Sequence, residues 1–350
     1  MTHRSAEALF EGTLAADLLA AARNAALICL GAQKQEVATL VTDDESREGM
    51  AAIAAALIEA GVEVHAFILE ELGRRPITGV PKEIIETLEA SQISVFWSMP
   101  LPGELKSRKQ ILLTTSEHML RHAHLIGLPK EHFIEGLQVD YRTVRALQER
   151  LVERLDRAST IRFVTPGGTS LVAPLPPERP WVCLSGIIQP GQWQNLPSGQ
   201  IMGVPADVEG TFVADASMGD WFGPKYRELE KYPLTLEIEG GRLRDARSPN
   251  QKLAREFLLY ARSNPNSDRV GELSLGTNLG LRRFTGLALV DENVPGCHLA
   301  LGNPLPELTG ATWESKTHVS VIGRRASVYL DEAPIMEDGV YAHDLVGGTS

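Results

Sequence analysis

The sequence predicts a two-domain protein, with an α/β domain over residues 1–158 and a β-rich α+β domain over residues 159–350. A chain of 350 residues exceeds the size at which one hydrophobic core usually stops growing. Strand-like and helix-like segments alternate up to residue 158, which is typical of a parallel sheet with flanking helices. After Ser159, glycine and proline become frequent and the apolar runs become short and β-branched, which favours antiparallel strands.

The first half is predicted to alternate between strands and helices. Residues 6–30 are rich in alanine and are expected to be helical. The β-branched run 36–42 precedes acidic and serine residues that can cap a helix over 47–60. The same reasoning predicts a strand at 62–69, a helix at 81–90 and a buried strand at 93–99. No Gly-x-Gly-x-x-Gly follows the first strand, so nothing here indicates a dinucleotide.

The second half is predicted to consist mainly of strands. A charged helix at 140–157 precedes a hairpin that turns at Gly167-Gly168, and a later hairpin turns at Gly240-Gly241. One clear helix is expected at 250–263. Near the C-terminus, apolar runs bounded by glycine or polar residues are expected to be strands; they are 270–278, 296–303 and 316–320.

Composition limits the partners and the compartment. A formal charge of −11 argues against a nucleic-acid partner, because phosphate neutralisation needs a surplus of Lys and Arg. Three cysteines without a Cys-x-x-Cys pattern suit a reducing cytoplasm. The N-terminal residues lack a leader pattern, and no apolar stretch reaches the ~20 residues that a membrane span needs. We therefore expect a cytoplasmic protein that binds a small molecule.

Each of the three C-terminal runs carries one side chain that can bind a metal: Glu272, His298 and His318. One carboxylate and two imidazoles on neighbouring strands can hold a divalent cation with open positions. The alternatives are a Glu272 that pairs with an arginine and a His298 that is a satisfied core imidazole. We predict a metalloenzyme with one divalent ion, which could be Zn, Mn, Co or Fe.

Residues that could contact a substrate precede these strands. Asn195, Ser198 and Gln200 lie in a Pro-Ser-Gly turn, and turn residues on a rigid scaffold often touch substrate. Trp193 could form a wall for a flat or apolar ligand. His118 and His122 are four apart on an expected helix, and we interpret them as a solvated helix end.

Several segments of the second half occur together in a characteristic order. They are Gly168–Leu171, Asn195–Gln200, Glu209–Asp215, Leu236–Arg242, Gly271-Glu272, Asp291–Asn293, His298–Gly302 and His318. In this order the chain resembles the metal-dependent aminopeptidases of the T and S type and the related 2,5-dihydroxypyridine dioxygenases. The resemblance implies an N-terminal α/β domain, an active site in the C-terminal domain and a homodimer.

The chain departs from these families at three positions. Gln200 stands where the aminopeptidases usually carry Glu, Ser320 where they carry Asp, and Leu305 where they carry a functional Tyr. The resemblance thus implies at most one metal, and it marks Gln200 and Ser320 as catalytic positions and Leu305 as a substrate contact. The dioxygenases use two His and one Asp as iron ligands, and these align with Glu272, His318 and Ser320.

The sequence leaves three functions open. The first is a metal-dependent hydrolase of a small amide or cyclic C–N substrate, which uses a metal-activated water. Its general base would be one of several carboxylates, namely Asp215, Asp291, Glu292 or Glu314. The alternative is an Fe(II) dioxygenase that cleaves a hydroxylated aromatic or heteroaromatic ring, because two His and one carboxylate form a facial triad. The third is a metal-free, non-enzymatic relative. Glu272 and His298 match the aminopeptidases better, so hydrolysis is preferred.

Overall fold

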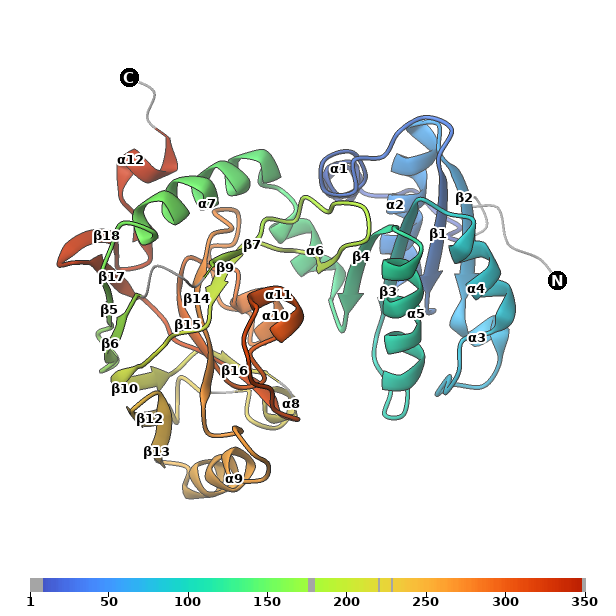
Figure 1. The fold of residues 1–350 in the computed structure, drawn as a ribbon. Coiled ribbons are helices and arrows are strands. Elements are labelled where there is room, and N and C mark those ends of the chain that lie inside the picture. Colours follow the sequence, from blue (N-terminus) through green and yellow to red (C-terminus); the bar gives the residue numbers. More distant parts are fainter. Residues whose placement is uncertain (1–8, 176–179, 220, 228, 348–350) are drawn as a thin grey trace. The chain divides into compact units, whose positions relative to one another are not determined.

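The computed structural model describes residues 9–175, 180–219, 221–227 and 229–347 (Figure 1). The chain forms two compact units. The first comprises Met1–Arg142 and Gly186–Ser198, and the second comprises Thr143–Ser185 and Gly199–Ser350. One unit contains a parallel sheet with helices and the other contains antiparallel sheets, so the predicted combination of an α/β part and a β-rich part is confirmed.

The first unit is built on a five-stranded parallel sheet of order β2-β1-β3-β4-β8. Its strands are β1 (Val37–Thr42), β2 (Glu63–Ile68), β3 (Ile93–Ser98), β4 (Arg121–Ile126) and β8 (Trp193–Asn195). β1 and β3 are almost wholly buried, as expected for central strands of a parallel sheet covered on both faces. The predicted strands at 36–42, 62–69 and 93–99 are therefore confirmed.

Helices cover both faces of this sheet. They are α1 (Ala16–Asn24), a π-helical segment (Ala25–Cys29), α2 (Arg47–Glu59), α3 (Leu69–Leu72), α4 (Lys82–Glu89), α5 (Leu105–Glu117) and α6 (Lys130–Gly136). α1 packs on α2, and α4 packs on α5. The connection from β1 to β2 runs one way along the sheet, and those from β2 to β3 and from β3 to β4 run the other way. Because such connections are right-handed, α2 lies on one face and α4 with α5 on the other. The helix predicted from residue 6 begins at Ala16, and residues 6–8 lie outside the described residues.

The segment Gly186–Ser198 packs differently from the sequence prediction, which assigned it to the β-rich domain. Its short strand β8 pairs in parallel with β4, with Asn195 opposite His124. The predicted boundary at 158/159 falls inside the second unit, after helix α7 (Tyr141–Leu155). A three-residue strand carries no periodicity from which its partner sheet could be predicted.

The second unit contains two antiparallel sheets. The eight-stranded sheet has the order β13-β12-β10-β6-β5-β17-β18-β19, and the six-stranded sheet has the order β11-β16-β15-β14-β9-β7. The strands of the larger sheet are β5 (Thr160–Val164), β6 (Ser170–Pro174), β10 (Glu209–Ala214), β12 (Leu234–Glu239), β13 (Arg242–Arg247), β17 (Ser327–Leu330), β18 (Ala333–Glu337) and β19 (Val340–Tyr341). β5 pairs with β6 and β12 with β13, as the two glycine turns predicted.

The six-stranded sheet carries the predicted metal ligands. Its strands are β7 (Val182–Leu184), β9 (Gln200–Gly203), β11 (Ser217–Met218), β14 (Val270–Gly276), β15 (Gly296–Gly302) and β16 (His318–Ile322). The remaining helices are α8 (Phe222–Lys225), α9 (Gln251–Ala261), α10 (Ala288–Asp291), α11 (Pro306–Thr309) and α12 (His343–Val346). Among the described residues, no helix has the length and apolarity to cross a membrane.

Pairing register separates the two faces of this sheet. On β14, β15 and β16 the odd-numbered side chains are apolar and belong to the hydrophobic core of the unit; they are Leu273, Leu275, Leu299, Leu301, Val319 and Val321. The even-numbered side chains point to the opposite face, because strand side chains alternate. That face carries Gln200, Glu272, Ser274, His298, His318 and Ser320. The strand period thus brings the three predicted metal ligands, Gln200 and Ser320 onto one surface.

Candidate active site

The centre of the polar face is a row of three residues on adjacent strands. Glu272 on β14 lies opposite Ala300 on β15, and Ala300 lies opposite Ser320 on β16. Facing residues of antiparallel strands project to the same side. Because Ala300 has only a methyl group, the middle of the row leaves room for a side chain from another element.

Glu272 is a buried carboxylate, with only 5% of the residue exposed. Gln200 on β9 donates a hydrogen bond from Nε2 to Glu272 Oε1 over 2.5 Å, and is itself 4% exposed. Burial raises the pKa of the Glu272 carboxyl, which His318 and hydrogen bonds from Ser274 and Gln200 partly oppose. Gln200 therefore orients Glu272, and the structure brings both predicted residues together.

Glu292 is a second carboxylate at this site, directly after helix α10. Burial, and then repulsion from Glu272 and Asp291, raises its pKa to about 8, while a hydrogen bond from Ser320 acts the other way. Part of the Glu292 side chain reaches the surface, but its carboxyl group lies among protein atoms. Sequence reasoning ranks Glu292 no higher than three other carboxylates, because the packing of α10 against β16 is a tertiary contact.

In the part of the chain that the structure describes, the two carboxylates are not balanced by an arginine or a lysine. Among the described residues, neither Glu272 nor Glu292 forms an ion pair with Arg or Lys, and His318 is the only basic group that acts on Glu272. The predicted alternative of a Glu272–arginine pair is therefore wrong: Arg269 lies over the Trp313 ring instead. Two adjacent buried carboxylates need a proton or a cation to offset their repulsion.

His298 is buried on the same face, with 1% exposure. Its Nε2 lies 3.2 Å from the carbonyl oxygen of Val294, which can only accept, so Nε2 carries the hydrogen. Nδ1 has no hydrogen-bond partner among the described residues. Burial lowers the pKa of His298 to about 4, so the ring is neutral at pH 7. Interactions with the backbone of Val294 and Cys297 oppose this effect of burial on the pKa.

His318 has a similar arrangement at the start of β16. Its Nδ1 donates to the carbonyl oxygen of Asn303 over 2.8 Å, which leaves Nε2 as the free ring nitrogen. An imidazole whose second nitrogen donates to a backbone carbonyl is typical of metal ligands. Leu305 lies two residues after Asn303, and its N–H donates to Asn303 Oδ1 over 3.2 Å. Asn303 therefore bonds to both His318 and this predicted substrate contact.

The two imidazoles stand at opposite ends of the polar face. His318 faces Gly302, and His298 lies further along β15, four residues away. At a rise of roughly 3.3 Å per residue, this separates their backbone positions by about 13 Å along the strand. No three His, Cys, Asp or Glu side chains in the described part of the chain lie close enough to hold a metal ion as they stand. The predicted set of Glu272, His298 and His318 shares a face but remains a prediction.

The other predicted substrate contacts belong to the first unit. Trp193, on the edge strand β8, is 41% exposed and lies edge-on to His124 at 6.1 Å. Asn195 ends β8. Ser198 is buried, its hydroxyl contacts Gln194 Oε1 at 3.3 Å, and its N–H donates to Tyr141 Oη. Ser198 has a structural role in its own unit, whereas the exposed face of Trp193 is free for a ligand.

The remaining carboxylates considered as general bases are engaged elsewhere or exposed. Asp291 accepts hydrogen bonds from the Thr285 N–H and hydroxyl and from the Gly286 N–H, so it holds a turn. Asp215 accepts a hydrogen bond from the Arg324 N–H at 2.8 Å. Glu314 is exposed. Glu292 is the one that contacts the polar face.

The interpretation of His118 and His122 as a helix end is wrong for His122. Helix α5 ends at Glu117, Met119 adopts a left-handed φ of 59°, and His122 lies on β4. His122 Nδ1 lies 2.6 Å from Ser94 Oγ, and its Nε2 lies 3.1 Å from His124 Nδ1. Burial lowers the pKa of His122 to about 3, so this pair is neutral and packs the core of the first unit.

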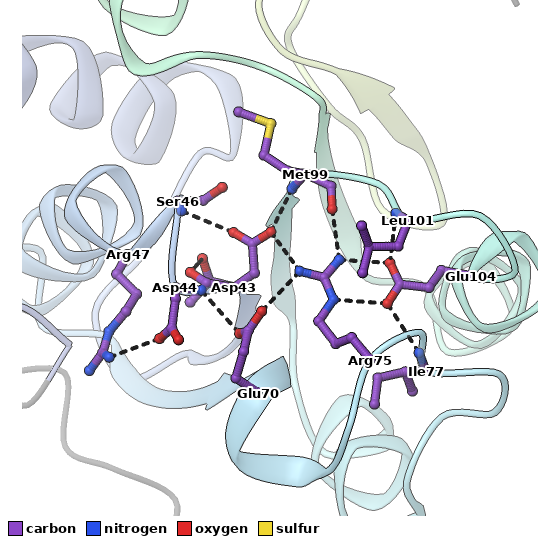
Figure 2. Close-up of polar contacts among 11 residues, drawn as sticks. Asp43, Asp44, Ser46, Arg47, Glu70, Arg75, Ile77, Met99, Leu101 and Glu104 are labelled. Carbon is purple, nitrogen blue, oxygen red and sulfur yellow. Dashed lines mark hydrogen bonds and ion pairs between the residues drawn. The ribbon is translucent and has the colours of Figure 1, made fainter. Parts of the chain in front are cut away.

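The first unit has its own acidic cluster at the carboxyl edge of the parallel sheet (Figure 2). Order β2-β1-β3 makes the β1/β3 edge a topological switch point, where ligands of α/β folds usually bind. Here the Arg75 guanidinium fills that position. It donates to Asp43 Oδ2 at 2.9 Å, to both oxygens of Glu104 and to the Met99 carbonyl oxygen. Hydrogen bonding to Glu104 is the main cause of the raised pKa of Arg75.

No protein-family model and no curated protein matches this sequence. Two solved structures are similar over nearly the whole chain. The 2,5-dihydroxypyridine dioxygenase from Pseudomonas putida KT2440 has a TM-score of 0.67 and 18% identity, covering 94% of this chain and 98% of the dioxygenase. AmpT from Thermus thermophilus has a TM-score of 0.62 and 20% identity, covering 93% and 99%. The chain has their fold.

These two proteins are the types to which the sequence motifs pointed, so the predicted resemblance is confirmed at the level of the fold. Both neighbours are enzymes, one a dioxygenase and the other an aminopeptidase. The same fold thus accommodates two different chemistries in these neighbours.

Proposed function

We propose that this protein is a metal-dependent hydrolase that acts on a small amide or cyclic C–N substrate. Glu272 and His318 would hold a single divalent cation, which when bound would polarise the carbonyl and lower the pKa of a water. Two donors suit such an ion: Glu272 is a buried carboxylate that pairs with no arginine or lysine of the described residues, and His318 has one ring nitrogen that does not bond to Asn303. Gln200 would fix the orientation of Glu272 through its amide, and Ser320 would orient Glu292.

The separation of the two imidazoles carries the preference for hydrolysis. An Fe(II) oxygenase of the facial-triad type needs two imidazoles and one carboxylate on the same ion. His298 and His318 lie about 13 Å apart along the strand at roughly 3.3 Å per residue. The carboxylates Glu272 and Glu292, in contrast, lie close enough to repel each other. A site with one imidazole on the ion and a second carboxylate nearby suits a hydrolytic Lewis acid better than a facial triad.

Metal-restored activity tests the proposal. The metal-free protein should hydrolyse aminoacyl p-nitroanilides after addition of Mn²⁺, Zn²⁺ or Co²⁺, and Glu272→Gln should abolish this hydrolysis. Glu153→Gln, on the exposed side of α7, is the matched control and should leave the rate unchanged. Oxygen uptake with Fe²⁺ and 2,5-dihydroxypyridine, without amide hydrolysis under any metal, would establish the alternative reading. A protein that binds no metal and shows neither activity would support the non-enzymatic reading.

The proposal also includes a cytoplasmic homodimer that binds a small molecule, with Trp193 and Asn195 as substrate contacts. Light scattering on the purified protein tests the dimer. A Trp193→Ala variant tests the contact. Loss of this exposed side chain should raise KM without changing the unfolding midpoint.

A further inference from the structure

Helix α5 covers one face of the parallel sheet in the first unit. Phe96 on β3 belongs to the same hydrophobic cluster as Ile111 on α5, so this is the face that α5 covers. His124 on β4 lies opposite Phe96, and the two rings stack with their centroids 5.3 Å apart. Trp193 on the edge strand β8 is edge-on to His124 at 6.1 Å, and α5 packs on both β4 and β8. Phe96, His124 and Trp193 therefore form an aromatic row that runs from under α5 to the edge of the sheet.

Arg108 is a charged residue on the side of α5 that packs on this sheet. It lies one turn after the buried Glu104 and one turn before the buried Ile111. Its Nε is buried and has no hydrogen-bond partner among the described residues. Burial lowers the pKa of Arg108, which the charge of Glu104 opposes, but an arginine keeps its charge at pH 7. Buried polar groups nearly always have a partner, so this N–H indicates an acceptor other than the described residues.

Glu104 is the nearest carboxylate along the helix, but its hydrogen-bonding capacity is used elsewhere. Oε1 accepts from Arg75 Nε and from the Ile77 N–H, over 2.9 and 3.1 Å. Oε2 accepts from Arg75 Nη2 and from the Leu101 N–H, over 2.7 and 3.1 Å. Each oxygen thus has two donors, and Arg108 Nε remains without an acceptor.

His124 lies at a similar depth in the sheet to Arg108. Residues 118–120 connect the end of α5 directly to the start of β4. From this connection, His124 is three residues into the strand, or about 10 Å at roughly 3.3 Å per residue. Arg108 is nine residues back along the helix, or about 14 Å at roughly 1.5 Å per residue. The two differ in height by less than one helical turn, and the charge of Arg108 is one cause of the lowered pKa of His124.

A chain of hydrogen bonds can supply a second donor from His124. Ser94 Oγ lies 2.6 Å from His122 Nδ1, and His122 Nε2 lies 3.1 Å from His124 Nδ1. When Ser94 donates to His122 and His122 donates to His124, the neutral His124 ring carries its hydrogen on Nε2. That nitrogen forms no hydrogen bond among the described residues.

We propose that Arg108, His124 and Trp193 form a binding site for a small aromatic carboxylate. The carboxylate accepts hydrogen bonds from Arg108 Nε and His124 Nε2, because a guanidinium binds the planar carboxylate group better than other anions or neutral acceptors. The aromatic ring of the ligand packs on Trp193, which is 41% exposed at the end of the aromatic row. The site belongs wholly to the first unit. It goes beyond the proposed function, with which it shares only Trp193, and it needs no metal ion.

Calorimetric titration of the full-length, metal-free protein with benzoate tests this site. Benzamide lacks the charge and acetate lacks the ring, so wild type should bind benzoate at least about tenfold more tightly than either. Arg108→Met should weaken benzoate binding by about 10–100-fold, as expected for loss of a hydrogen bond between charged groups. Arg108→Lys should bind almost as weakly, because lysine keeps the charge but has no guanidinium fork. Lys109→Met, on the exposed side of the same helix, is the matched control and should bind as wild type.

Two further variants separate the parts of the site. His124→Phe keeps a ring in the aromatic row but removes the donor, so it should weaken the binding of both benzoate and acetate. Trp193→Leu should weaken benzoate binding and leave acetate binding unchanged.

Urea denaturation separates binding from folding. A guanidinium without an acceptor does not stabilise the fold, so Arg108→Met should unfold at the same or a higher urea concentration than wild type. A clearly lower midpoint would show that Arg108 has a structural partner and would overturn the proposal. Wild-type benzoate affinity in Arg108→Met, or equal affinity of wild type for benzoate and benzamide, would also overturn it. A wild type that binds no benzoate would do the same while leaving metal-dependent hydrolysis untouched.

Discussion

Each unit of this protein contains a buried acidic cluster, and the two clusters differ in how their charge is balanced. In the first unit, Asp43 and Glu104 have side chains that are 1% and 3% exposed, and Arg75 bonds to both. In the second unit, Glu272 and Glu292 lie together with no arginine or lysine beside them among the described residues. The first cluster is complete by itself, whereas the second needs a further positive group.

The difference shows which cluster is structural. Backbone N–H groups and Arg75 hold Glu104 in its ionised form: although burial acts to raise its pKa, these hydrogen bonds lower it overall. The Glu292 carboxyl has a raised pKa because burial and neighbouring carboxylates outweigh the single hydrogen bond from Ser320. The switch point between β1 and β3 is a usual place for a ligand in α/β folds, but here Arg75 occupies it. The polar face of the second unit is therefore the stronger candidate for the active site.

Removal of Arg75 should have the largest effect. Arg75→Met leaves two buried carboxylates with backbone N–H donors but without the arginine, and loss of one partner of a buried ion pair typically costs about 3–5 kcal/mol in the free energy of unfolding. Urea denaturation measures this. Arg23→Met, which breaks the exposed pair with Glu59, is the matched control and should cost at most about 1 kcal/mol. Equal effects of the two variants would show that the Arg75 network is as weak as a surface pair.

The two clusters should respond to pH in opposite directions. The folded-state pKa of Glu292 is about 8 against an ordinary value of 4.5, so between these values the folded protein binds more protons than the unfolded chain. Stability of the metal-free protein should therefore fall as pH rises from 5 to 8, by roughly 1 kcal/mol or more, which is about 2–4 °C in Tm. Glu104 has a lowered pKa, so its contribution should be lost as pH falls below 4.5.

Melting curves of the metal-free protein at a series of pH values check this prediction. Glu292→Gln should remove most of the loss between pH 5 and 8 and leave the acid-side loss unchanged. A Tm that stays flat from pH 5 to 8 in wild type would show that the Glu292 carboxyl ionises freely in the folded state.

Ser320→Ala should have the smallest effect. The variant loses one hydrogen bond to Glu292, which is worth about 0.5–1.5 kcal/mol. Metal affinity should fall by about tenfold or less, because Ser320 acts through Glu292. Calorimetric titration with Mn²⁺ measures it, and Ser327→Ala on β17 is a control outside the site. A loss as large as that of Glu272→Gln would instead make Ser320 a ligand.

Much of the architecture could be predicted from the sequence, because strand and helix periods are local. The runs around Glu272, His298 and His318 predict strands, and the pairing register places all three side chains on one face. What could not be predicted depends on tertiary contacts. The register that separates His298 from His318 leaves no mark in spacing or composition. The same is true of the packing of α10 on β16, next to which Glu292 meets Ser320.

The place of Gly186–Ser198 could not be predicted for a related reason, since β8 joins the parallel sheet by pairing with β4. This strand also has a practical consequence. The chain passes between the units at 142/143, at 185/186 and again at 198/199, so neither unit is a continuous stretch of sequence. A fragment cut after residue 158 would remove β8 from its sheet, leaving β4 with an unpaired edge prone to aggregation. Separate expression of the parts should therefore use a circularly permuted or linker-bridged gene instead of simple truncation.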